Sequence, residues 1–285
     1  MVKVHLLRSA LWVWRFGEDM RIVDLSLPID DTAVEVHPFG IDRLGHKKGV
    51  QHLNWVMMKR TLWGRISFLL GKRIIRPQDL PDGEFLSLET VHSPVHIGTH
   101  IDYSFHYGSR SEGRPSKTID ELPLEWCFSD GVVLDFSYKK PGEVISPDEV
   151  DSALEKINYH LKPADIVLLR TDADRFFGSK DYLSNYPGVS PEAIEYILDR
   201  GVKIIGIDTL GFDRPYKFMM QDFLRTHDAK YLWPAHFLGR KREYAHIERL
   251  TNLDKLPPFG FKVACFPVRI KDVGAAWARV VAMIE

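Results

Sequence analysis

The sequence predicts an α/β fold, because short apolar runs alternate along the chain with segments that carry the start and stop signals of helices. The chain has 285 residues, which is enough to bury a full core and is compatible with one large domain. Apolar residues make up 45% of the chain and charged residues 27%, as in an ordinary soluble globular protein. No linker, low-complexity tract or internal repeat divides the sequence, so we expect a single domain.

The expected strands are short apolar runs of the kind that form buried strands. They cover residues 131–136, 165–171, 202–208 and 261–268.

Two helices are expected between these strands, and each has a clear start signal. Ser146-Pro-Asp-Glu149 is a capping box with proline at the first helical position, which predicts a helix through about His160. Ser190-Pro-Glu begins a second helix, which we expect to end near Gly201.

Residues 51–72 stand apart, because they repeat apolar side chains at helical spacing among basic ones and so predict an amphipathic helix. The favoured role of this helix is packing against a core or forming a dimer. The alternative is a mobile lid or pocket wall near the site, with contact to a membrane surface as a further option.

Charge and cysteine content limit the expected partners and compartment. The 38 basic and 39 acidic residues nearly balance, so no overall attraction to nucleic acid or to an anionic membrane is expected, and a small-molecule substrate is favoured. No apolar run reaches the roughly 18 residues that span a membrane, so we expect no stable membrane insertion. Cys127 and Cys265 lie far apart in apolar contexts, without the pattern of a disulfide framework, which favours the cytoplasm.

The most informative segment is residues 96–106, which contains His96, His100, Asp102 and His106. Gly98 and Thr99 argue against a helix here, and positions two apart on a helix do not face each other. In an extended strand these four even-numbered positions point the same way, and Gly98 allows a bulge or a close backbone approach.

A single histidine is usually a structural residue, but this group favours chemistry. Three histidines and an aspartate on one strand face would leave several polar groups to satisfy inside a core. One divalent metal ion would satisfy them together, so the segment predicts a metal site. A further histidine and glutamate, His236 and Glu248, follow a strand-like run. By composition alone they cannot be ranked above their neighbours Glu243, His246 and Asp254.

The segment from His96 to His106 resembles the signature His-x-Gly-Thr-His-x-Asp-x-Pro-x-His of the cyclase family of metal-dependent hydrolases, which includes kynurenine formamidases and isatin hydrolases. Further similar segments follow in the family's order around the signature, and together they cover about residues 20–285. They are Asp24–Ser26, Asp120–Leu124, Asp165–Thr171, Tyr186–Ser190, Gly206–Thr209 and Phe266–Arg269.

The resemblance implies a compact α/β domain of the swivelling β/β/α type, with a mixed, barrel-like sheet flanked by helices. That domain would span residues 21–285. Residues 1–20 look like an N-terminal extension, and the helix at 51–72 looks like an insertion. The resemblance also implies assembly as a homodimer or homotetramer.

The same resemblance assigns roles to the site residues. His96, His100 and Asp102 would bind a first metal ion, zinc or manganese, and His106 would donate and accept protons. His236 and Glu248 match the residues of a second metal site, with Asp102 and Glu248 as bridging carboxylates. One or two ions per subunit are expected.

Two departures from the family pattern bear on the substrate. Ser104 stands where the signature has proline, which affects the loop that carries His106. His37 stands where kynurenine formamidases place a tryptophan that holds the substrate, so we expect His37 in the substrate pocket and doubt formamidase activity on kynurenines.

The expected reaction is hydrolysis of an amide, lactam, lactone or ester carbonyl in a small molecule. A divalent metal brings the pKa of its bound water from about 15.7 towards about 7, and His106 is suited to the proton transfers because an imidazole ordinarily titrates near neutral pH. A cyclase or isomerase that uses the metal as a Lewis acid is the first alternative. A non-catalytic metal-binding protein is the second.

Overall fold

The computed structural model describes residues 20–285. The predicted N-terminal extension, residues 1–20, therefore lies outside the described chain apart from Met20. The described residues form two compact units, one made of residues 20–29 and 98–285 and the other of residues 30–97.

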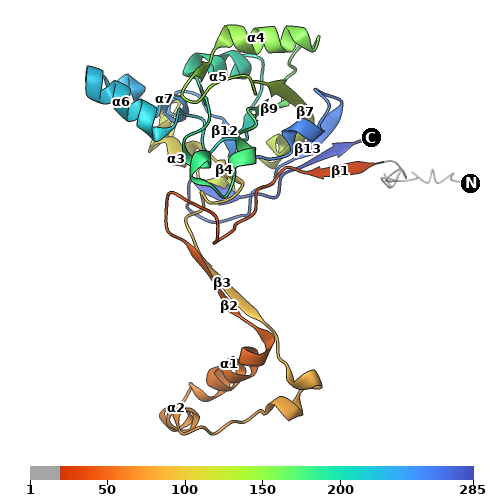
Figure 1. Ribbon diagram of the computed structural model, residues 1–285, viewed down its shortest axis with the longest axis vertical. Helices are drawn as coiled ribbons and strands as arrows, with labels where there is room; N and C mark the ends of the chain where they lie inside the picture. The colour runs from red at the N-terminus through yellow and green to blue at the C-terminus, as the bar shows by residue number, and fades with distance from the viewer. Residues whose placement is uncertain (1–19) are drawn as a thin grey trace, which may run out of the picture. The chain divides into compact units, whose positions relative to one another are not determined.

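The first unit is built on a curled, nine-stranded mixed sheet (Figure 1). Its strands lie in the order β1-β15-β13-β7-β9-β11-β12-β4-β14. Their bounds, in that order, are Arg21–Asp24, Val281–Ile284, Phe261–Ala264, Phe128–Asp135, Ile166–Arg170, Ile204–Ile207, Ala245–Glu248, His100–Asp102 and Ala275–Trp277.

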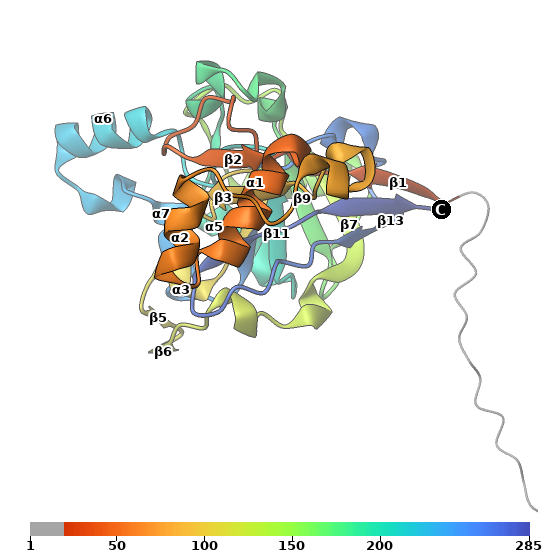
Figure 2. The ribbon, with the colours of Figure 1, turned by 90° about the horizontal axis from the view of Figure 1, so that it is seen from below.

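The centre of the sheet is parallel, from β7 through β9 and β11 to β12, and the outer pairings are antiparallel. Figure 2 shows β7, β13 and β1 towards one side of this sheet. Alternate residues of the central strands enter two different cores. In β9, for example, Ile166 and Leu168 pack in one cluster and Val167 and Leu169 in the other. This two-sided burial explains the continuous apolar runs in the sequence, and the four predicted strands are confirmed.

Helices α4 (Pro147–Lys156) and α5 (Pro191–Leu198) cover one face of the sheet, where their apolar residues join the core (Figure 1). Ser146 begins α4 with the predicted capping box, since its Oγ accepts from the Glu149 N–H and its own N–H donates to the Glu149 carboxylate. Ser190 caps α5 by accepting from Ala193 N. Both predicted helix starts are confirmed.

The remaining elements of this unit are three further helices, two small ribbons and several 3₁₀ turns. The helices are α3 (Ser104–Tyr107), α6 (Tyr216–Thr226) and α7 (Pro234–Leu238). Two small ribbons pair β5 (Arg110–Ser111) with β6 (Arg114–Pro115) and β8 (Val144–Ile145) with β10 (Gly188–Val189). Single 3₁₀ turns lie at Ile119–Glu121, Leu124–Trp126, Ala173–Phe176, Lys180–Leu183, Ala229–Tyr231 and Leu253–Lys255.

A buried carboxylate joins the ends of two central strands. Asp208 follows β11 and accepts hydrogen bonds from Thr171 N, Thr171 Oγ1 and Asp172 N, just beyond β9. These bonds hold the loops at the carboxyl ends of the parallel strands, the edge at which α/β proteins usually place a site.

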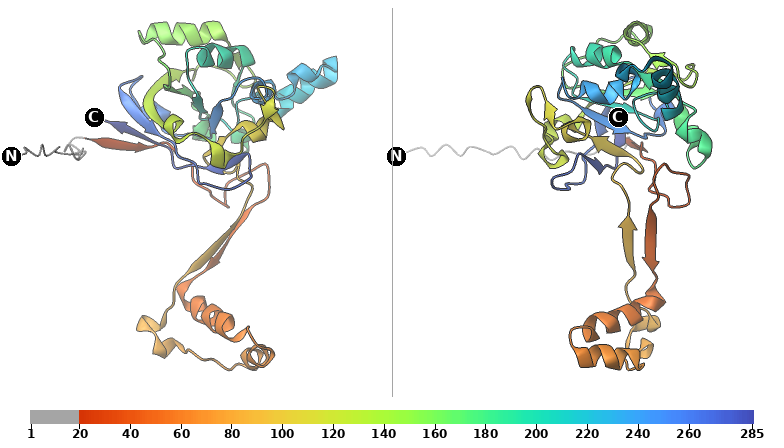
Figure 3. Two further views of the ribbon diagram at one scale, coloured as in Figure 1. Left: turned by 180° about the vertical axis from the view of Figure 1, so that it is seen from behind. Right: turned by 90° about the vertical axis from the view of Figure 1, so that its left-hand side faces the viewer.

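The second unit is an antiparallel ribbon that leads into two helices (Figure 3). The ribbon pairs β2 (Gly40–Leu44) with β3 (Leu88–His92). The helices are α1 (His46–Met58) and α2 (Leu62–Leu69), followed by 3₁₀ turns at Pro77–Asp79 and Pro81–Gly83.

The structure differs here from the single helix predicted for residues 51–72. The helical periodicity is present, but Thr61 has extended backbone angles and its side chain accepts from Gly64 N, so it caps a new helix. A capping threonine in the middle of the apolar pattern thus divides it into α1 and α2. Within residues 20–285, no helix combines the length and the apolar character needed to cross a bilayer.

Candidate metal centre

The candidate site forms where β4 pairs with β12. This antiparallel register sets Asp102 opposite His246 and Glu248 opposite His100. The four side chains are buried. Both strands lie inside the sheet, because β4 also pairs with β14 and β12 also pairs with β11. Strand pairing therefore gathers two carboxylates and two imidazoles from positions about 146 residues apart in the chain.

The predicted extended strand through residues 96–106 is wrong outside its centre. Only His100–Asp102 is strand, Gly98 has a φ of 69°, and Ser104–Tyr107 form the helical turn α3. His106 reaches the site because a helical turn brings position i+4 back towards Asp102, rather than by strand alternation. The close approach expected at Gly98 is confirmed, since a Cβ there would lie 3.0 Å from Ile29 Cγ1.

Each carboxylate lies between the same two histidines. Asp102 Oδ1 is 3.4 Å from His100 Nε2, and Asp102 Oδ2 is 3.7 Å from His236 Nε2. Glu248 Oε2 is 3.5 Å from His100 Nε2, and Glu248 Oε1 is 3.5 Å from His236 Nε2. These distances exceed those of ordinary N–H···O hydrogen bonds. They are close to the roughly 3.3 Å between two ligands that share a tetrahedral ion at about 2.0 Å.

His246 has the geometry expected of a metal ligand. Tyr244 Oη donates to Ala235 O at 3.1 Å, so it accepts the bond from His246 Nε2 at 2.5 Å, and that nitrogen carries the proton. The lone pair of Nδ1 then faces Glu248 Oε1 at 3.9 Å. This Nδ1 is buried and has no hydrogen-bond partner among residues 20–285. A lone pair facing a carboxylate is unfavourable unless a cation binds both.

The environment keeps the His246 imidazole neutral, as metal ligation requires. The ring is fully buried, stacks on Phe212 at 3.8 Å between centroids, and lies near other histidines. Burial, with the charge of His236, lowers the pKa of His246 well below its usual value. One atom each of Asp102, His236, His246 and Glu248 can be chosen so that all four lie within 4.8 Å of one another. This donor set fits a divalent metal ion.

Asp213 orients His236 at the start of α7. The Asp213 carboxylate accepts from Ala235 N at 2.7 Å and from His236 N at 3.2 Å, and it lies 2.6 Å from His236 Nδ1. Burial by itself lowers the pKa of His236, but the neighbouring carboxylates of Asp102, Asp213 and Glu248 raise it well above its usual value. Without a metal, the carboxylates thus hold a proton on this ring, which a metal ion would displace.

His106 lies at the edge of the cluster and is open to solvent. Its side chain is 32% exposed, and its Nε2 lies 3.6 Å from Asp102 Oδ2. The next residue, Tyr107, is buried and ties the two strands of the site together, because its hydroxyl donates to Asp102 O and accepts from His246 N.

The structure therefore brings together five of the predicted site residues, namely His100, Asp102, His106, His236 and Glu248. Of the neighbours that composition could not rank, His246 joins the cluster, whereas Glu243 bonds Tyr103 and Lys117, and Asp254 is exposed in a 3₁₀ turn. His96 and His37 belong to the second unit, half-buried and exposed respectively, and stay predictions.

Two site residues were missed from the sequence. His246 stands two positions before Glu248, and strand alternation would have placed both on one face had a strand been expected at residues 245–248. Asp213 lies in a loop with no local pattern around it, and only the folded chain brings it to His236.

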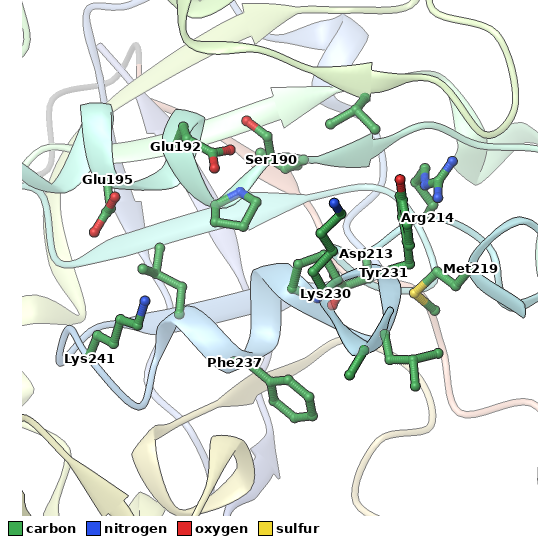
Figure 4. Close-up of a pocket in the computed structure, with 17 residues that line it drawn as sticks. Ser190, Glu192, Glu195, Asp213, Arg214, Met219, Lys230, Tyr231, Phe237 and Lys241 are labelled. Carbon is green, nitrogen blue, oxygen red and sulfur yellow. The ribbon is translucent and has the colours of Figure 1, made fainter. Parts of the chain in front are cut away.

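A cavity of about 610 Å³ lies beside α7 (Figure 4). Asp213, Arg214, Met219, Tyr231 and Phe237 are among its lining residues. None of the predicted metal ligands lines it. Asp213 connects the cavity with the cluster, because it lines the cavity and its carboxylate bonds the ring of His236.

Comparison with known proteins identifies the family. Residues 23–214 match the model of the Cyclase family, which is more than half of the chain. The chain belongs to this family. The match contains the segment from His96 to His106 and ends before His236 and Glu248.

The chain is also similar to isatin hydrolases, both in sequence and in structure. The isatin hydrolase of Roseibium aggregatum is 25% identical over an alignment of 213 positions, which covers 71% of this chain and 77% of that protein. Among solved structures, an isatin hydrolase bound to the product analogue thioisatinate has a TM-score of 0.69 at 19% identity, covering 93% of this chain and 92% of the other. Isatin hydrolase A of Ralstonia solanacearum has a TM-score of 0.68 at 20% identity with the same coverage. The expected mixed α/β fold of the cyclase family is thus confirmed.

Proposed function

We propose that this Cyclase family protein is a metal-dependent hydrolase that cleaves an amide, lactam, lactone or ester carbonyl of a small molecule. The observation that carries the proposal is the buried set of Asp102 and Glu248 around His100, His236 and His246, with the half-exposed His106 at its edge. The named activity of the relatives supports a cyclic amide related to isatin as the first substrate to test.

The residues that would hold the metal follow from the distances. His100, Asp102, His236, His246 and Glu248 supply donors within the cluster, and His96 is the predicted sixth. Because Asp102 and Glu248 each face both His100 and His236, they are suited to bridging two ions. When bound, a divalent ion makes hydroxide available near neutral pH and polarises a carbonyl oxygen. Zinc and manganese both accept this mixture of imidazole and carboxylate ligands.

The protein's own groups perform the remaining tasks. His106 takes the proton of the attacking water at Nε2 and returns it to the leaving nitrogen or oxygen, because it borders the cluster and stays open to solvent. Asp213 fixes the ring of His236, and Tyr107 fixes the backbones of Asp102 and His246. The buried sheet around Asp102 and Glu248 keeps bulk water from their carboxylates, which strengthens every charge interaction among them.

An ¹⁸O experiment tests hydrolysis against the cyclase alternative that the family name favours. The protein, loaded with zinc or manganese, is incubated in H₂¹⁸O with isatin, aryl formamides, lactones and simple esters, and the products are analysed by mass spectrometry. Hydrolysis incorporates one ¹⁸O into the acid product, whereas cyclisation or isomerisation incorporates none. Bound metal without turnover on any compound would favour a metal-binding protein instead.

Two variants locate the chemistry. His100→Ala is expected to lose both metal and activity, because it removes a ligand that contacts both carboxylates. His106→Ala is expected to keep its metal and lose about 10²- to 10⁴-fold in turnover, the usual contribution of a general acid–base group. A His106→Ala variant with unchanged turnover would remove His106 from the mechanism. A cytoplasmic location and a homodimer or homotetramer belong to the same proposal.

A further inference from the structure

Helix α2 presents an apolar surface that the fold does not use. Its sequence is Leu-Trp-Gly-Arg-Ile-Ser-Phe-Leu, and none of its side chains is buried. Leu62 is 72% exposed, Trp63 78% and Leu69 79%, and Leu70, directly after the helix, is 74% exposed. Four large apolar side chains exposed on one short segment are unusual on a soluble surface, where they generally indicate an interaction site.

The neighbouring structure holds α2 in place without covering it. Asn54 of α1 is buried, and both atoms of its side-chain amide bond the backbone of the segment that follows α2. Its Nδ2 donates to Ile75 O, and its Oδ1 accepts from Ile74 N and Ile75 N. Trp55 and Phe68 pack with their ring centroids 5.4 Å apart. The surface of α2 is therefore formed before any partner arrives, so little ordering entropy is lost on binding.

The Lys and Arg side chains around α2 are not balanced by acidic ones. Residues 46–76 contain eight Lys or Arg and no Asp or Glu, although the whole chain is balanced. The rest of the chain consequently has 30 basic and 39 acidic residues. None of the eight cations forms an ion pair within the described part of the chain. They are Lys47, Lys48, Lys59, Arg60, Arg65, Lys72, Arg73 and Arg76.

We propose that residues 46–76 bind the surface of an anionic lipid bilayer, with the apolar side chains of α2 in the interface and the basic side chains against the lipid phosphates. Exposed Leu and Trp among Lys and Arg are the composition of helices that lie in the membrane interface. Eight residues of helix rise about 12 Å, so α2 lies within the interface and does not cross the bilayer.

The charge pattern disfavours a symmetric contact between two α2 segments, and the apolar side chains disfavour a nucleic acid. A two-fold contact between α2 segments of two copies would bring sixteen cationic side chains together, which costs free energy through repulsion. A nucleic acid would neutralise the cations but offers no apolar partner for Leu62, Trp63 and Leu69 on a preformed helix. A bilayer surface satisfies both features at once.

The test is co-sedimentation of the full-length protein with vesicles. One set contains phosphatidylcholine alone and the other also about 30 mol % phosphatidylglycerol. We expect binding to the anionic vesicles, and a decrease in that binding when NaCl rises from about 0.1 M to about 0.5 M. The variant Leu62→Ser/Leu69→Ser is expected to lose at least about tenfold in partition coefficient, because two exposed apolar anchors are removed.

The matched control is Leu124→Ser/Leu224→Ser. It makes the same two replacements at leucines that are 62% and 63% exposed in the first unit, and its partition should equal that of the unchanged protein. Circular dichroism checks that both variants fold. Turnover of a water-soluble substrate should be the same in both, so a failure of the hydrolase proposal would leave this test intact.

Several results would overturn the proposal. They are equal binding to neutral and anionic vesicles, no binding to anionic vesicles at low salt, or a decrease in the partition coefficient of the control variant equal to that of Leu62→Ser/Leu69→Ser. A smaller oligomer for Leu62→Ser/Leu69→Ser by light scattering, without any vesicle binding, would assign α2 to contact between copies. Tight binding of duplex DNA that survives this double substitution, again without vesicle binding, would assign the basic residues to nucleic acid.

Discussion

Asp213 Oδ2 lies 2.6 Å from His236 Nδ1, while the same carboxylate accepts hydrogen bonds from the backbone N–H groups of Ala235 and His236. One buried side chain therefore fixes both the first turn of α7 and the ring that the helix carries. Because Nδ1 is held by Asp213, Nε2 is directed at Asp102 and Glu248. A carboxylate behind a ligating histidine is a common way to set its orientation and basicity.

Replacing Asp213 with Asn should weaken metal binding by about 10- to 100-fold, the usual effect of removing such a supporting partner. The measurement is competition for zinc or manganese against a chromophoric chelator. Asp222→Asn is the control, since Asp222 pairs with Arg214 and Arg225 outside the cluster and its loss should leave metal affinity unchanged. Equal affinities in all three proteins would show that Asp213 does not act on the site.

His246→Phe tests whether the Nδ1 atom is a metal ligand. Phenylalanine keeps an aromatic ring against Phe212 and removes both nitrogens, so the protein should fold and yet bind metal at least about tenfold more weakly. Metal stoichiometry and affinity are read by elemental analysis and titration. Phe212→Leu changes the same stack without removing a donor atom, and it should bind metal like the unchanged protein. If both variants bind equally well, His246 is a structural residue.

Gly274 lies against the backbone of His106. A Cβ on Gly274 would sit 2.7 Å from His106 N and 2.9 Å from its Cα, and Gly274 O also accepts from Tyr103 N. Gly274→Ala should therefore displace His106 and lower kcat about 10- to 100-fold while the metal stays bound. Gly40→Ala, where a new Cβ meets nothing within 4 Å, is the control. Steady-state kinetics with metal analysis checks the prediction, and a large loss of metal would contradict it.

Two hydrogen bonds to Glu243 are expected to make the stability of the protein depend on pH in the acid range. Burial raises the pKa of Glu243, but hydrogen bonds from Tyr103 and Lys117 outweigh it and leave the pKa below its ordinary value of 4.5. A lowered carboxyl pKa contributes stability that is fully present above the unfolded value and is lost as pH falls through the folded value. Melting temperatures between about pH 6 and about pH 3 should thus fall less steeply in Glu243→Gln than in the unchanged protein.

The control for this pH effect is the exposed Glu125, whose Gln variant should follow the unchanged protein. Parallel curves for all three proteins would rule out a contribution from Glu243.

Much of the fold was predictable because its signals are local. Continuous apolar runs, and the caps at Ser146 and Ser190, depend on a few neighbouring residues, and they predicted the central strands and the helices that cover them. The division of the helix at Thr61 was missed, since the apolar period continues through it and only the capping bond to Gly64 N interrupts it.

The site was predictable where one motif carries it and not where the fold assembles it. His100, Asp102 and His106 share a short segment, although their geometry comes from a strand followed by a helical turn rather than from one strand face. His246 and Asp213 reach the cluster through the pairing of β12 with β4 and through the start of α7. Those are contacts between distant parts of the chain: local alternation places His246 on the same strand face as Glu248, but it does not show that this strand pairs with β4.

The most direct test of the hydrolase account is a metal titration of chelator-treated protein, with bound metal measured by elemental analysis and turnover measured on the substrate found in the screen. Turnover is expected to fall to background in the metal-free protein and to rise in proportion to bound zinc or manganese. Full turnover in protein shown to contain no metal would contradict the account.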